Sequence, residues 1–265
     1  MSFTGESPHG PPVKCGAPLS DITAGILAAM GILAAYVHRL KTGQGQWVET
    51  SLFEAALVQT YWQSAIALAT GVAPRAMGSA HPFNAPYQAF EASDGWIVVG
   101  GANQKNWLRM LDALNATELA GDPRFISGAD RMAHLQELET ELGKRFRIKP
   151  AKYWISALED KGVPCGPVHD MLQALADAQT LAREMVVEVE HSALGPVKTL
   201  GLPVKFSATP GKVRAGAPLY GEHTRQVLHE YGFDDQQIDC FEKEGAIVTS
   251  MPRHARERWP DAVAP

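Results

Sequence analysis

The chain has 265 residues, of which 45% are hydrophobic and 20% charged, and its formal net charge is −5 at pH 7. This composition is typical of a globular protein that is long enough for one or two domains. The middle of the chain has no strongly basic block, which argues against nucleic-acid binding. The basic tail at 253–258, RHARER, is interpreted as a short solvated segment.

The cysteines and histidines do not form a metal-binding pattern. Cys15, Cys165 and Cys240 lie far apart without a CxxC pair, and the nine histidines contain no HExxH motif. We therefore expect no metal site and a reducing, cytoplasmic location. The first residues have neither the charged nor the apolar region of a signal peptide, so none is expected.

The first predicted helix covers 21–41, with Ser20 or Asp21 as its N-cap. Its apolar run ILAAMGILAAYV, at 26–37, is shorter than the roughly 20 residues that a membrane span needs. The run is rich in alanine and glycine, which allow the backbone of a neighbouring segment to approach closely. We therefore predict a buried helix of a soluble protein and no membrane partner.

The rest of the chain alternates helices with a few short strands, which favours an α/β or α+β class. No phosphate-binding GxGxxG or GxxxxGK[ST] motif is present. The predicted elements in chain order are a strand at 46–52, a helix at 53–71, a loop at 72–90, a strand at 93–101, helices at 103–114, 129–146 and 149–162, a connector at 163–168, a helix at 170–185, strands at 186–191 and 195–206, a loop at 210–224, and helices at 224–232 and 234–247.

Asp21 has two interpretations on the residues alone. As the N-cap of the first helix it would stabilise that helix by about 0.5–2 kcal/mol. As a carboxylate at a helix N-terminus, flanked by small uncharged residues, it could instead meet a ligand and act as nucleophile or proton acceptor.

Three further candidates lie in the loop AHPFNAPYQAF at 80–90, namely His81, Asn84 and Tyr87. Two prolines stiffen this loop, and a stiff loop that carries polar groups suits a binding site. Such a loop could equally cover one edge of a core, so the residues alone leave its role open.

Several segments together resemble the class III coenzyme A transferases, the CaiB/BaiF family. No single motif is decisive, but their order and spacing are highly specific, and the resemblance extends from residue 1 to about residue 247. The segments are GPPVKCGAPLSDITAGILAAMGILAAYVHRLKTGQGQWVETSLFEAAL (11–57), HPFNAPYQAF (81–90), SDGWIVVG (93–100), DPRF (122–125), GVPCGPV (162–168), MVVEVEH (185–191) and APLYGEHTRQVL (217–228). The resemblance implies the α/β fold of the CaiB/BaiF-type transferases.

The resemblance also implies a chemistry, in which CoA moves from an acyl-CoA donor to a carboxylic acid acceptor. Asp21 takes the position of the family's nucleophile, and His81, Asn84 and Tyr87 are carried over as residues that line the substrate and CoA site. Acyl-CoA and CoA are substrates, and no permanently bound cofactor is expected. The loop 78–87 is the candidate source of backbone N–H donors for the developing oxyanions.

Family members are longer at the N-terminus, so the resemblance implies a C-terminal portion that lacks the N-terminal Rossmann-like segment. Under this reading 1–70 is the remaining part of the large CoA-binding domain, 71–84 a linker loop, 85–200 the small domain, and 201–265 a return to the large domain with a tail. The family forms interlocked homodimers, and a chain lacking that segment would expose apolar surface.

Two alternatives stay open. One is an acyl-CoA racemase or epimerase of the same superfamily, in which the matching aspartate is an acid/base group. The other is an inactive fragment, or one half of a split transferase whose N-terminal half is encoded separately.

Overall fold

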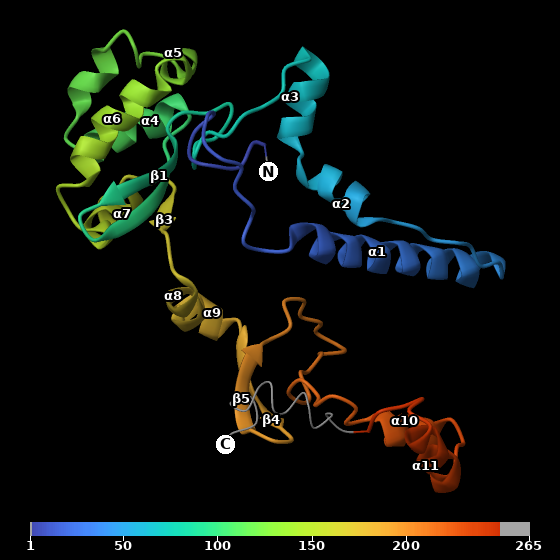
Figure 1. Cartoon of the computed structure of the whole chain (residues 1–265). Helices are drawn as coiled ribbons and strands as arrows, with labels where there is room; N and C mark the ends of the chain where they lie inside the picture. Colours follow the sequence, from blue (N-terminus) through green and yellow to red (C-terminus); the bar gives the residue numbers. More distant parts are fainter. Residues whose placement is uncertain (1, 250–265) are drawn as a thin grey trace. The chain divides into compact units, whose positions relative to one another are not determined.

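The computed structural model describes residues 2–249 (Figure 1). The chain divides into two compact units, Met1–Val168 and His169–Pro265, which are treated separately below. The boundary between them falls inside the segment 85–200, and the assignment of that segment to a small domain remains a prediction. The basic tail at 253–258 lies outside the described residues.

The long helix α1, Leu19–Thr42, opens the first unit. Pro18 occupies the N-cap without a side-chain hydrogen bond, and its carbonyl accepts the Ile22 N–H at 3.1 Å. The prediction that Ser20 or Asp21 caps the helix is therefore wrong, because the helix begins before both. Asp21 lies instead in the first turn of α1.

The prediction that α1 is buried is also wrong for the described part of the chain. Within residues 2–249 none of its side chains is buried, and large apolar ones on several sides are exposed. Contacts come from α2 and from the segment just after α1, which cover only part of its surface. By length and composition α1 could cross a membrane, but a single helix of this kind is weak evidence for a span.

The segment 46–51 is irregular rather than a strand. It passes so close to α1 that a Cβ on Gly31 would lie 2.7 Å from Cγ1 of Val48. The helix predicted at 53–71 is divided into α2, Leu52–Gln59, and α3, Trp62–Thr70. It breaks at Tyr61, whose φ of 34° does not fit a helix.

A three-stranded antiparallel sheet follows, in the order β1-β2-β3. Its strands are β1, Tyr87–Ala92, β2, Gly95–Gly100, and the short β3, Cys165–Pro167. Side chains alternate between the two faces, so Ile97 and Val99 enter the core while their neighbours face outward. Sequence reasoning placed β1 in a loop and β3 in a connector.

Helices cover the inner face of this sheet and close a core of aromatic and aliphatic side chains (Figure 1). The helix predicted at 129–146 is two helices, because His134 leaves helical geometry with a φ of −116°. The elements are α4, Gln104–Ala113, the 3₁₀ turn η1, Thr117–Gly121, α5, Gly128–Ala133, α6, Leu135–Phe146, and α7, Ala151–Asp160.

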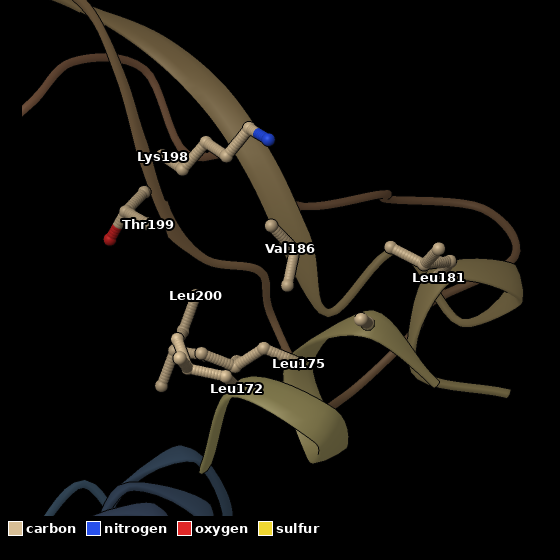
Figure 2. A pocket seen from close by; sticks show the side chains of 8 residues that line it. Leu172, Leu175, Leu181, Val186, Lys198, Thr199 and Leu200 are labelled. Atoms are coloured by element: carbon tan, nitrogen blue, oxygen red, sulfur yellow. The ribbon is translucent and has the colours of Figure 1, made fainter. Parts of the chain in front are cut away.

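The second unit contains the predicted strand pair, with β4, Val186–His191, antiparallel to β5, Gly195–Leu200. Leu172 and Leu175 lie beside Leu200 of β5 in the wall of an apolar hollow of about 610 Å³, which Leu181 also lines (Figure 2). The helices of this unit are α8, Met171–Ala176, α9, Ala178–Ala182, α10, Thr224–Glu230, and α11, Asp235–Lys243.

Candidate functional site

Asp21 presents an exposed carboxylate at the N-terminal end of α1. Within residues 2–249 it forms no hydrogen bond or ion pair with another side chain. A Cβ placed on Gly25, one helical turn after Asp21, would meet no atom within 4 Å, so α1 is uncovered at that position. The unpaired N–H groups of the first turn favour a negative charge here. The geometry therefore leaves Asp21 free to act as a nucleophile.

His81 and Asn84 of the loop before β1 lie close to Tyr87, the first residue of β1. The His81 N–H donates to the carbonyl of Tyr87 at 3.0 Å, which closes the loop onto the first residue of β1. The His81 ring stacks on the Tyr87 ring, with centroids 5.3 Å apart and an interplanar angle of 6°. The N–H of Phe83 donates to Nδ1 of His81 at 3.1 Å, and Nδ2 of Asn84 lies 3.2 Å from the same atom.

This loop forms part of two hollows, and Tyr87 lies in the wall of both. The first hollow, of about 420 Å³, is shared with the start of α3, where Trp62 lies 5.4 Å from the His81 ring. The second hollow, of about 670 Å³, lies along the outer face of the sheet and is lined by Asn84, Tyr87, Val98, Gly100, Ala102, Asn103, Asn106, Pro164, Cys165 and Gly166.

Cys165 is not equipped to act as a nucleophile in the second hollow. It pairs with Val99, whose side chain enters the core, and its Sγ lies 3.7 Å from the carbonyl of Ile155. Burial raises the pKa of this thiol, so it stays protonated at neutral pH. The side chain instead packs, partly buried, against the hydrophobic core.

Sequence reasoning missed Arg131, which anchors the loop from behind. Its side chain is only 1% exposed, and Nε donates to the carbonyl of Ala85 at 2.8 Å. Nη1 donates to the carbonyl of Phe125 at 3.0 Å and to Oε1 of Gln104 at 3.1 Å. Burial lowers the pKa of the guanidinium, which lies over the Trp107 ring. No motif in the sequence marks this arginine.

The structure does not place Asp21 in contact with the loop, but it links their surroundings. Oγ1 of Thr23, two residues after Asp21, accepts a hydrogen bond from Nε2 of Gln59 at 2.8 Å. Gln59 in turn lines the 420 Å³ hollow beside His81. The N-terminal end of α1 and the loop therefore share one neighbour.

The described residues provide no metal centre. Within residues 2–249, no three His, Cys, Asp or Glu side chains are grouped so that they could hold an ion.

Several curated proteins match most of the chain. It is 36% identical over 249 residues to an acyl-CoA transferase of Fusarium pseudograminearum, a match that covers 93% of this chain and 54% of the relative. It is 35% identical over 228 residues to the acetyl-CoA:oxalate CoA-transferase of Acetobacter aceti, covering 84% of this chain and 57% of the relative. The chain thus spans about half the length of the curated relatives it matches.

The fold leads to the same group of proteins. The structure is similar to a crystal structure of a CaiB/BaiF family protein from Brucella suis, with a TM-score of 0.74 and 32% identity over 87% of this chain and 59% of the other. The family model described as CoA-transferase family III matches residues 1–224. The mixed α/β fold and the expected family are therefore confirmed, and the chain belongs to CoA-transferase family III.

Proposed function

We propose that this chain carries the nucleophile of a CoA-transferase that moves CoA from an acyl-CoA donor to a carboxylic acid acceptor. The observation that carries the proposal is the exposed carboxylate of Asp21 in the first turn of α1, within a segment that matches the family model. One relative is named an acyl-CoA transferase and the other an acetyl-CoA:oxalate CoA-transferase, and both names support CoA transfer as the reaction class.

The reaction needs no external energy source, because every intermediate holds an activated acyl bond, first in the mixed anhydride and then in the thioester between Asp21 and CoA. An oxygen of Asp21 attacks the thioester carbonyl and expels CoA thiolate, which leaves a mixed anhydride between Asp21 and the acyl group. The thiolate then attacks the aspartyl carbonyl, forms an aspartyl–CoA thioester and releases the donor acid. The acceptor carboxylate attacks this thioester, and the same two steps in reverse give the new acyl-CoA and free Asp21.

The exposed apolar surface of α1 supports a partner in the working enzyme. Leu33 and Leu40, for instance, are 65% and 67% exposed, and such surface on a soluble protein marks an interaction site. We propose that the active form is a homodimer, or an assembly with a separately encoded N-terminal half. The chain on its own is then expected to react slowly or not at all.

Intact-mass spectrometry tests the nucleophile directly. The chain is incubated with acetyl-CoA, succinyl-CoA and oxalyl-CoA, alone and together with an N-terminal half taken from the Acetobacter aceti relative. We expect an acyl or CoA adduct on Asp21 that hydroxylamine removes and that Asp21→Asn abolishes. Asp177→Asn, a change at a half-buried aspartate of the second unit, is the matched control and should keep the adduct.

Absence of an adduct under all of these conditions would refute the proposal. Exchange of the α-proton of a 2-methylacyl-CoA with solvent deuterium, without an adduct, would instead indicate a racemase.

A further inference from the structure

The ring of His81 is fixed by its neighbours in one orientation. One face stacks on Tyr87, and the Trp62 ring lies 5.4 Å away at an interplanar angle of 55°. The backbone N–H of His81 is itself tied to the carbonyl of Tyr87. Because Tyr87 begins β1, the imidazole is held by the edge of the sheet rather than by a free loop.

The hydrogen bonds to Nδ1 decide which ring nitrogen carries the proton. The N–H of Phe83 points at Nδ1 from 3.1 Å, and the amide nitrogen of Asn84 lies 3.2 Å from it. A backbone N–H can only donate, so Nδ1 must be the acceptor and carries no hydrogen. The neutral ring therefore holds its single proton on Nε2, which then acts as a donor.

Nε2 has no hydrogen-bond partner within residues 2–249, and His81 lines the 420 Å³ hollow. The neighbour shared with α1, Gln59, lines the same hollow, and it is held by Thr23 two residues from Asp21. A donor with a fixed direction thus borders a space that adjoins the N-terminal end of α1.

We propose that His81 acts as a fixed hydrogen-bond donor, through Nε2–H, to the carbonyl oxygen of the acyl group that Asp21 attacks. This inference rests on the proposed function. When the carboxylate adds to the thioester carbonyl, the oxygen becomes an oxyanion, and a donor already in place stabilises it without reorganisation. His81 neither gives up nor takes a proton in this step, because its lone pair at Nδ1 is engaged by Phe83.

Three substitutions separate donation from packing. In His81→Gln the side-chain amide nitrogen takes a position near that of Nε2, whereas in His81→Asn the amide reaches only as far as Nδ1. His81→Phe keeps a ring to stack on Tyr87 but has no N–H. The rate of Asp21 adduct formation at saturating acyl-CoA is measured for each variant, together with the affinity for free CoA by calorimetry.

We expect His81→Phe and His81→Asn to slow adduct formation by about 100-fold, as for the loss of one oxyanion donor. His81→Gln should stay within about 10-fold of the unmodified chain, and the affinity for CoA should not change. Equal rates for His81→Phe and the unmodified chain would overturn the proposal. Equal slowing in all three variants would also overturn it, because His81 would then act only through packing.

The tautomer can be measured without any activity. Long-range ¹H–¹⁵N correlation spectra of the full chain, assigned with His81→Gln, should show His81 protonated at Nε2 and not at Nδ1. A proton on Nδ1 would overturn the proposal even if every variant folds. An unmodified chain that forms no adduct even together with the N-terminal half of the Acetobacter aceti relative would refute the proposed function itself, whereas an Asp21-dependent adduct that is insensitive to His81 would refute only this inference.

Discussion

Replacing Arg131 by methionine should destabilise the first unit while nearly keeping side-chain volume. The substitution removes the donors to the carbonyls of Ala85 and Phe125, at 2.8 and 3.0 Å, in a region where water cannot replace them. Each buried acceptor left without a partner costs about 1–3 kcal/mol. Methionine also removes a buried charge, which offsets part of this loss. We therefore expect the free energy of unfolding to fall by about 2–4 kcal/mol.

Hydrogen exchange under native conditions, read by mass spectrometry, is the suitable assay because the two units need not unfold together. In Arg131→Met, amide protection in peptides from α4 and α6 should fall by the amount that corresponds to this loss of unfolding free energy. Amide protection in peptides from α10 and α11 should not change. Arg147→Met is the matched control, since Arg147 is 59% exposed and its ion pair with Glu91 should contribute about 1 kcal/mol at most. Protection in α4 and α6 equal to that of the control would refute the reasoning.

Two further predictions concern helices of the same unit. Gly25→Ala should raise the stability of α1 by about 0.5–1 kcal/mol, because the new methyl group meets open space. Gly31→Ala should stabilise α1 less, because the side chain of Val48 must move to make room for the methyl group. Thermal unfolding followed by circular dichroism compares the two variants. Hydrogen bonds from Ser127 lower the pKa of Asp130 below its ordinary value of 3.8. The ionised Asp130 carboxylate therefore stabilises the fold fully at pH values above 3.8, and this stabilisation is lost as the pH falls through the lower pKa of the folded state. Asp130→Asn should therefore flatten the acid limb of a pH–stability curve, and an unchanged acid limb would contradict this.

Local patterns were enough to predict several elements. Helix α4 agrees with its prediction because Asn103 caps it and its apolar positions repeat with helical spacing. The β4–β5 pair agrees with the strands predicted at 186–191 and 195–206, although β5 ends at Leu200. The failures occur where one residue changes the backbone within a continuous pattern, as Tyr61 and His134 do in their helices.

Only the part of the site whose residues lie close together in the sequence could be predicted. His81, Asn84 and Tyr87 lie within seven residues, so a stiff loop was sufficient reason to group them. Arg131 stands 46 residues from the carbonyl of Ala85 that it binds, and its burial depends on how the helices pack. The exposure of α1 is likewise not encoded in its own residues, because an apolar helix indicates that a covering surface is needed but not which chain supplies it.

Tyr87 has a consequence for anyone who would redesign this protein. Because one side chain forms part of the wall of both hollows, neither can be enlarged at that position without altering the other. A smaller residue there would also remove the surface on which the His81 ring rests. Changes in the shape of the two hollows are therefore coupled, and a smaller residue at position 87 should require a compensating change near His81.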